Sequence, residues 1–252
     1  MRIVDLSVPI APSPTEVPEL FRTEIEFVAH EQGARDIEAM FGVGPELLRN
    51  GEGWAVEAFT RFGTHNSTHV DAPYHYNSVV EGRPAQTIDQ LPLHWFFRPG
   101  VVLDFHERAD GEAIEEEDVS GALVAAGHEL APLDIVLIRT GRDAFYHEPD
   151  YPARGPGVSA AATRWLYERG VRVMGVDAWG WDRPLHLQAQ EALDTGRPGI
   201  FWAAHQSDLA YSQIERLANL DQLPPTGFTV ACFPLRLAGA GAAPARVVAI
   251  LE

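Results

Sequence analysis

The order of apolar and polar residues along the chain predicts short strands at both ends and a strand–helix–strand unit in the second half. Strands of a half-buried sheet alternate with period two, and fully buried strands are short apolar runs. Stretches of these two kinds occur at residues 2–8, 54–62, 101–105, 134–140, 171–176, 229–237 and 246–251. We expect each of them to be a strand.

Helical spacing occurs in two places. Residues 115–126 have it and stop at Gly127. Residues 160–169 lie between Ser159, a side chain that caps helix N-termini, and Gly170, a common helix stop. The second helix leads directly into the apolar stretch 171–176, which gives the rhythm of an α/β fold.

The remaining segments predict connections rather than domain boundaries. Residues 9–20 are rich in Pro and Ser, and residues 177–200 combine Trp, Asp, Gly and Pro in one long connection. There is no repeat, low-complexity tract or linker. We therefore predict one α/β domain over residues 1–252, with a mixed central or barrel-like sheet flanked by helices.

Composition removes several classes of function. The chain has 252 residues, 46% of them hydrophobic, which suits a globular protein with a sizeable core. A formal net charge of -17 disfavours nucleic acid and anionic lipid as partners. Cys232, the one cysteine, lies in an apolar run and predicts a core residue. The N-terminus has no secretory pattern and no run could span a bilayer, so we expect a cytoplasmic protein.

The segment HNSTHVDAPYH at residues 65–75 is the most informative stretch of the chain. His65, His69, Asp71 and His75 all occupy odd positions, so in an extended segment they would face one way. In a helix, His65 and His69 would also share a face, but Pro73 argues against a helix through the whole segment. Either geometry gathers imidazoles and a carboxylate, which are ligands for zinc, manganese or iron.

A second patch supplies further candidate ligands. His205 and Glu215 could complete a metal site, and Gln213 shares a face with Glu215 if that stretch is extended. A ligand set with an open position lets the ion lower the pKa of bound water to roughly 7. A further histidine beside that water can move protons.

These residues resemble the cyclase-type metal hydrolases, the family of bacterial kynurenine formamidase and isatin hydrolase. Its hallmark is His-x-Gly-Thr-His-x-Asp-x-Pro-x-His, and residues 65–75 match it with Ser67 in place of the glycine. Stretches similar to the family follow in order along nearly the whole chain, at residues 4–7, 134–141, 175–177 and 214–220.

The resemblance implies roles for the motif residues. His65, His69 and Asp71 are expected as metal ligands, His75 as the catalytic acid–base, and Zn²⁺ or Mn²⁺ as the ion. His205 and Glu215 lie where some members complete a second metal site, and Gln213 lies where other members ligate a single ion. The interval from His205 to Glu215 is shorter than in the formamidases, which favours one ion.

Three functions fit these residues. The first is hydrolysis of an amide, lactam or lactone by metal-activated water, with His75 as acid–base. The second is a non-haem iron oxygenase that uses His69, Asp71 and His205. The third is a metal-binding module without catalysis, which leaves His75 unexplained. Oxygen consumption with iron and a keto acid would distinguish the second, and a hydrolysis screen the third.

The expected partner is a small cyclic or aromatic substrate. Trp179 and Trp181 follow a predicted strand, where ligands of α/β folds commonly bind, although both rings could instead be core or interface residues. The aromatic residues close to the motif residues in sequence could extend the wall of the pocket; they are Phe62, Tyr74 and Trp202. We also expect a homodimer or homotetramer.

Overall fold

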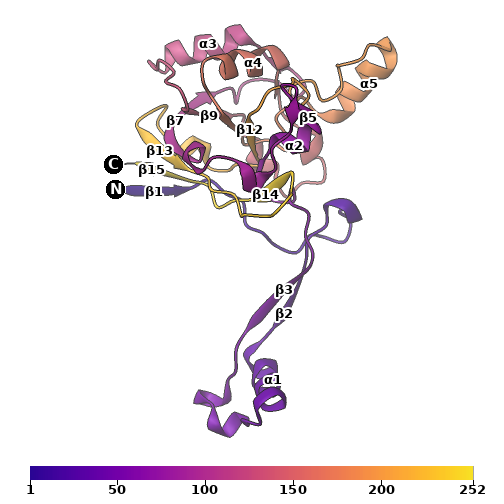
Figure 1. Ribbon diagram of the computed structural model, residues 1–252, viewed down its shortest axis with the longest axis vertical. Helices are drawn as coiled ribbons and strands as arrows, with labels where there is room; N and C mark the ends of the chain where they lie inside the picture. Colours follow the sequence, from indigo (N-terminus) through magenta and orange to yellow (C-terminus); the bar gives the residue numbers. More distant parts are fainter. Residues whose placement is uncertain (252) are drawn as a thin grey trace. The chain divides into compact units, whose positions relative to one another are not determined.

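A nine-stranded mixed sheet is the largest element of the computed structural model, which describes residues 1–251 (Figure 1). The chain divides into two compact units. Unit 1 is Met1–Pro9 together with the chain from Ser67 onward, and unit 2 is Ile10–Asn66. The prediction of one domain over residues 1–252 included no boundary at either point.

The sheet of unit 1 has the order β1-β15-β13-β7-β9-β11-β12-β4-β14. Its strands are β1 (Arg2–Asp5), β4 (His69–Asp71), β7 (Phe97–Asp104), β9 (Ile135–Arg139), β11 (Val173–Val176), β12 (Ser212–Glu215), β13 (Phe228–Ala231), β14 (Ala242–Pro244) and β15 (Val248–Leu251). The central strands β7, β9, β11 and β12 are parallel, and all other pairs are antiparallel. The predicted α/β class with a mixed central sheet is confirmed.

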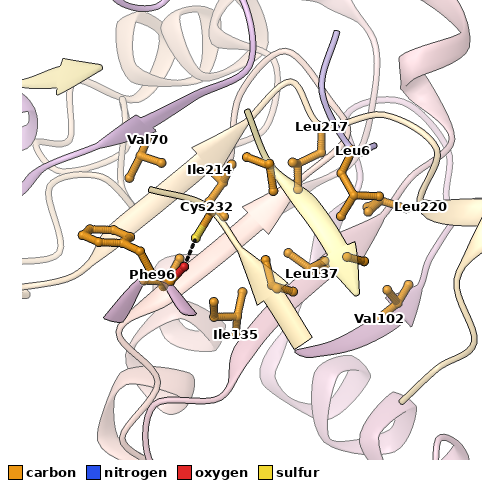
Figure 2. Close-up of a cluster of buried hydrophobic side chains, with 14 of the residues drawn as sticks. Leu6, Val70, Phe96, Val102, Ile135, Leu137, Ile214, Leu217, Leu220 and Cys232 are labelled. Carbon is orange, nitrogen blue, oxygen red and sulfur yellow. Dashed lines mark hydrogen bonds between the residues drawn. The ribbon is translucent and has the colours of Figure 1, made fainter. Parts of the chain in front are cut away.

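Both faces of the central strands are buried, which explains why they read as apolar runs rather than as alternating strands. On β9, Ile135 and Leu137 belong to one core cluster, whereas Val136 and Ile138 belong to the other. Figure 2 shows part of the first cluster, where Cys232 packs among aliphatic side chains of several strands. Cys232 is fully buried just after β13, as the sequence predicted for a core cysteine.

Three helices contribute buried residues to the second cluster. They are α2 (Pro73–Tyr76), α3 (Glu116–Ala125) and α4 (Ala160–Glu168); unit 1 also contains α5 (Leu185–Thr195). The expected N-cap of α4 is present, because the Ser159 side chain accepts a hydrogen bond from the amide of Ala162. Helices α3 and α4 lie beside each other (Figure 1), and their apolar residues pack into the second cluster.

The connection at residues 177–200 is more regular than the sequence analysis predicted, because it contains α5. This helix begins after Pro184 and ends at Gly196, which adopts a left-handed φ of 61°. Two small ladders complete unit 1: β5 (Val79–Val80) pairs with β6 (Arg83–Pro84), and β8 (Ala113–Ile114) pairs with β10 (Gly157–Val158).

Unit 2 is a two-stranded antiparallel ladder with one helix. Strands β2 (Glu24–Val28) and β3 (Val56–Arg61) pair, and α1 (His30–Phe41) follows β2. Helix α1 passes so close to the chain after it that a Cβ on Gly33 would lie 1.8 Å from the carbonyl oxygen of Trp54. Every residue of β3 is exposed.

The helices of the protein were compared with the length and apolar character of membrane-spanning helices. In residues 1–251, no helix has both the length and the apolar character needed to cross a membrane.

Candidate metal centre

The pairing of β4 with β12 creates the centre of the site. These strands are antiparallel, and His69 lies directly opposite Glu215. Asp71 shares a strand face with His69 because it lies two residues further along β4. The Nε2 atom of His69 lies 3.4 Å from Asp71 Oδ1 and 3.6 Å from Glu215 Oε2. One imidazole and two carboxylates therefore meet in the interior, with all three residues buried.

A backbone contact selects the tautomer of His69. Its Nδ1 lies 2.7 Å from the carbonyl oxygen of Ser67, and a carbonyl only accepts hydrogen bonds. We therefore assign the proton to Nδ1, which leaves the lone pair on Nε2, the atom that faces Asp71 and Glu215. This is the arrangement found for metal-ligating histidines, whose second nitrogen donates to a carbonyl or carboxylate.

His205 reaches the same centre from the turn that follows α5. Its Nε2 lies 3.5 Å from Glu215 Oε1, and its Nδ1 lies 2.5 Å from Asp182 Oδ2. Burial disfavours the imidazolium, but the hydrogen bonds and charges of Asp182 and Glu215 outweigh it and raise the pKa of His205 to about 10. A cation bound at Nε2 would have to displace that proton.

Glu215 is held in its charged form. Burial and the nearby Asp71 raise its pKa, but the hydrogen bond from His205 and the two imidazoles bring the pKa below its ordinary value. The amide of Trp181 also donates to Glu215 Oε1 at 2.9 Å. The carboxylate is therefore both oriented and ionised.

Gln213 lies on the same strand face as Glu215, two residues earlier in β12, because this stretch is extended, which was the condition set in the sequence analysis. Its amide nitrogen donates to the hydroxyl of Tyr211. Its Oε1 atom is buried, and none of the described residues donates a hydrogen bond to it. A buried oxygen without a donor is a candidate ligand for a cation.

His75 approaches the centre from α2. A ring nitrogen of His75 lies within 4.8 Å of a carboxylate oxygen of Asp71. The His75 ring lies edge-on to Trp202 at 5.0 Å between centroids, and Trp202 stacks on His205 at 4.4 Å. His75 is half-buried, whereas His69 is fully buried.

The extended geometry considered for the motif applies to only part of it. His69 and Asp71 lie in β4, but Pro73 is the first residue of α2, so His75 is carried by a helix. Proline suits this position because its missing amide has no partner in the first helical turn. His65 lies in a turn of unit 2, with its Nδ1 3.1 Å from Thr64 Oγ1. Its role as a ligand stays a prediction.

The aromatic residues predicted to bind substrate have different environments. Trp181 is fully buried and donates from Nε1 to Thr163 Oγ1 at 2.9 Å, so it is a core residue and not a pocket wall. A core role was the alternative kept open for both tryptophan rings. Trp179 is half-buried, and Tyr74 is 49% exposed. Phe62 lies in unit 2, where its ring packs against Phe59.

Two carboxylates of the site region escaped the sequence analysis. Asp182 orients His205, as described above, and Asp177 joins the ends of β9 and β11. Asp177 accepts hydrogen bonds from the amide and hydroxyl of Thr140, both at 2.6 Å, and from the amide of Gly141. Burial nevertheless raises the pKa of Asp177 to about 6. The sequence signal that could have identified Asp177 is its position directly after an apolar strand.

Comparison with known proteins gives relatives over most of the chain. The profile of the family described as "Putative cyclase" matches residues 4–183. A kynurenine formamidase of Salinibacter ruber is 31% identical over 192 residues, or 75% of this chain and 76% of the relative. An isatin hydrolase of Roseibium aggregatum is 26% identical over 198 residues, or 75% of this chain and 72% of the relative.

The solved structures agree with this result. Isatin hydrolase A from Ralstonia solanacearum is similar with a TM-score of 0.77 and 25% sequence identity. The match covers 100% of this chain and 92% of that one. The similarity therefore includes the whole fold.

Proposed function

This chain belongs to the cyclase family and is a hydrolase, and we propose that it cleaves an amide, lactam or lactone bond by metal-activated water with His75 as acid–base. The observation that carries the proposal is the buried group of His69, Asp71 and Glu215 beside His75. Its ligand atoms lie within 4.8 Å of one another. The relatives named above are hydrolases of small amides, which supports the reaction type and disfavours the oxygenase and the non-catalytic module.

The donor set fits a divalent cation. Two buried carboxylates face an imidazole lone pair on His69, and Gln213 adds a buried oxygen without a donor. Groups that all carry negative charge or lone pairs repel one another unless a cation lies between them. Nitrogen and oxygen ligands of this kind suit Zn²⁺ or Mn²⁺. We propose His69, Asp71 and Glu215 as ligands, with His65 added from the motif.

The number of ions depends on His205 and Gln213. Two ions would need His205 and Glu215 as ligands, with Asp71 as a bridge between them. One ion could use Gln213 or Glu215 from β12. We propose a single high-affinity ion, because the interval from His205 to Glu215 is shorter than in the formamidases that the sequence resembles.

The metal would polarise the scissile carbonyl and lower the pKa of water at the site. The chain supplies the remaining steps. His75 is half-buried, so its ring can meet both the site and solvent; it takes a proton from water and returns it to the leaving nitrogen or oxygen. Contact with Trp202 fixes one edge of the His75 ring, and Asp182 fixes the ring of His205.

A hydrolysis screen with bound metal tests this function. Protein loaded with Zn²⁺ or Mn²⁺ is assayed against formanilides, isatins and aromatic lactones, followed by chelation. We expect turnover of at least one class and its loss with chelator. His75→Ala should lose activity, whereas the control His128→Ala should keep it, because His128 pairs with Asp134 instead. No turnover by either metal form would overturn the proposal.

We also propose a small cyclic or aromatic substrate, a cytoplasmic location, and a homodimer or homotetramer. Support for self-association comes from unit 2, where Phe27, Phe41 and Phe59 are each more than half exposed. A two-stranded ladder is only marginally stable alone, so a partner surface would stabilise it. Sedimentation of the wild type and of Phe59→Ser tests this: a wild-type monomer contradicts it.

A further inference from the structure

Arg216 occupies an unusual backbone position directly after Glu215. Its φ is 58°, in the left-handed region that residues with a Cβ adopt infrequently. The position is fixed from both sides, because the amide of Arg216 donates to the carbonyl of Ala178 and its carbonyl accepts from Thr68 Oγ1. Strained positions of this kind tend to occur at functional sites.

The side chain of Arg216 is buried without a counterion. Only 6% of the residue is exposed. The Nε atom is buried, and no described residue accepts its hydrogen bond; no carboxylate in residues 1–251 forms an ion pair with this guanidinium. Arg142, by contrast, is held by Asp110 and by backbone carbonyls. An arginine stays charged in proteins, and a buried charge is costly unless an acceptor pairs with it.

One aromatic ring lies near this guanidinium, and a buried tyrosine whose pKa responds to the charge of Arg216 offers a second donor. The Cζ atom of Arg216 lies 5.2 Å from the ring centroid of Trp179. Tyr151 is 3% exposed, and its buried hydroxyl has no hydrogen-bond partner among the described residues. Burial raises the pKa of Tyr151, and the charge of Arg216 opposes that rise.

We propose that Arg216, Tyr151 and Trp179 form a binding site for the carboxylate of an aromatic substrate or of its product. The planar guanidinium presents a fork of N–H donors that matches a carboxylate, the phenol adds a third donor, and the indole face suits an aromatic ring. The negative charges of Asp177 and Asp143 also raise the pKa of Tyr151, and they disfavour a dianion such as phosphate near it.

Those two carboxylates are already engaged elsewhere. Asp177 accepts from Thr140 and Gly141, and Asp143 Oδ2 accepts from the amide of Asn219. They therefore lower the net charge of the region without pairing with Arg216. The alternative is that the negative charges of Asp177 and Asp143 stabilise the buried guanidinium and that Arg216 needs no ligand. The experiment must exclude this alternative.

The site adjoins the candidate metal centre, so the inference rests on the proposed function for its biological meaning. Arg216 follows Glu215, and Trp179 is separated by one glycine from Trp181, whose amide donates to Glu215.

Benzoate is the probe, and its binding to the full chain is measured by calorimetry with bound Zn²⁺ and again after chelation. Benzamide serves as the neutral ligand of the same shape. We expect benzoate to bind the wild type in both states and Arg216→Met to weaken it roughly 10–100-fold, the usual effect of removing a charged hydrogen-bond partner. Benzamide should change by less than about threefold, and Tyr151→Phe should weaken benzoate by about 3–10-fold.

Arg172→Met is the matched control, because Arg172 also lies over an aromatic ring, that of Tyr167, but donates to backbone carbonyls. It should leave benzoate affinity within about twofold. If Arg216→Met unfolds, Arg216→Lys and Tyr151→Phe take its place. Equal benzoate affinity in the wild type and in folded variants at Arg216 and Tyr151, or no binding by the wild type, overturns the proposal.

Kinetics then separate the two sources of the carboxylate. A substrate carboxylate predicts that Arg216→Met raises KM for N-formylanthranilate but not for formanilide. A carboxylate that hydrolysis itself creates, as in the opening of a lactam such as isatin, predicts that Arg216→Met leaves KM for the lactam unchanged and weakens inhibition by the product. Arg216-dependent binding of benzoate without any turnover would leave this site standing and refute the hydrolase proposal alone.

Discussion

Removing the charge of Asp71 should abolish the stabilisation of this protein by metal. The carboxylates of Asp71 and Glu215 lie within 4.8 Å of each other, which corresponds to a repulsion of at least about 3 kcal/mol at an effective dielectric of about 20. A cation at the site cancels that repulsion, and Asp71→Asn removes it without changing the volume of the side chain.

The stabilisation by metal can be worked out from binding. An ion at 100 times its Kd stabilises the folded state by about 2.7 kcal/mol. For a chain of about 250 residues, each kcal/mol shifts Tm by roughly 2–4 °C, so saturating metal should raise the Tm of the wild type by about 5–11 °C. Asp71→Asn should bind no ion at these concentrations and show no rise. Without metal, it should melt at or above the wild type.

Differential scanning calorimetry with chelator and with added Zn²⁺ or Mn²⁺ measures both effects, and elemental analysis gives the occupancy. The variant Asp143→Asn is a control, since Asp143 lies outside the centre and should retain the metal-dependent rise. Full occupancy and a wild-type rise in Asp71→Asn would refute the assignment of Asp71 as a ligand.

Four further outcomes are expected. His75→Ala should keep the metal by elemental analysis and lose about 10²–10⁴-fold in kcat; loss of the ion would make His75 a ligand instead. The purified protein should contain one tightly bound ion per chain, and two fully occupied sites in anomalous scattering would contradict this. Trp181→Phe should lower Tm without raising KM, because Trp181 is a buried hydrogen-bonded core residue, whereas Trp179→Ala should raise KM with little change in Tm; the reverse pattern would exchange their roles. The pKa of Asp177 in the folded state is about 6, above its ordinary value of 3.8, so the folded state binds this proton more tightly than the unfolded state does. The free energy of unfolding should therefore fall by about 3 kcal/mol as pH rises from about 4 to 6. Urea titrations at several pH values should show that fall in the wild type and not in Asp177→Asn. The same dependence of the free energy of unfolding on pH in both proteins would disprove this prediction.

The sequence by itself determined the features that depend on neighbouring residues. The apolar runs of β9 and β11 and the capped helix α4 between them could be predicted because burial on both faces, an N-cap serine and a terminal glycine act locally. The motif that supplies His69, Asp71 and His75 was likewise visible, since these residues lie within seven positions of one another.

Two further helices, α1 and α5, have local signals in the sequence but were not predicted. Residues 185–195 are rich in Leu, Ala, Gln and Glu, all strong helix formers, yet the surrounding Pro, Gly and Trp residues favoured an irregular connection. Helix α1 has an amphipathic repeat of apolar residues and is followed by Gly42, an ordinary stop signal, yet no helix was predicted there. In both cases the prediction gave too little weight to propensity.

The tertiary structure alone decided which distant groups share the site. Only the antiparallel pairing of β4 with β12 puts Glu215 opposite His69, and strand pairing over such a separation has no local signal. The same holds for the orientation of His205 by Asp182 and for the separate environments of Trp179 and Trp181. Composition and spacing identify the residue types that are capable of chemistry. The burial, the pKa and the hydrogen-bond partners of those residues depend on contacts that form only when the strands pair in the folded sheet.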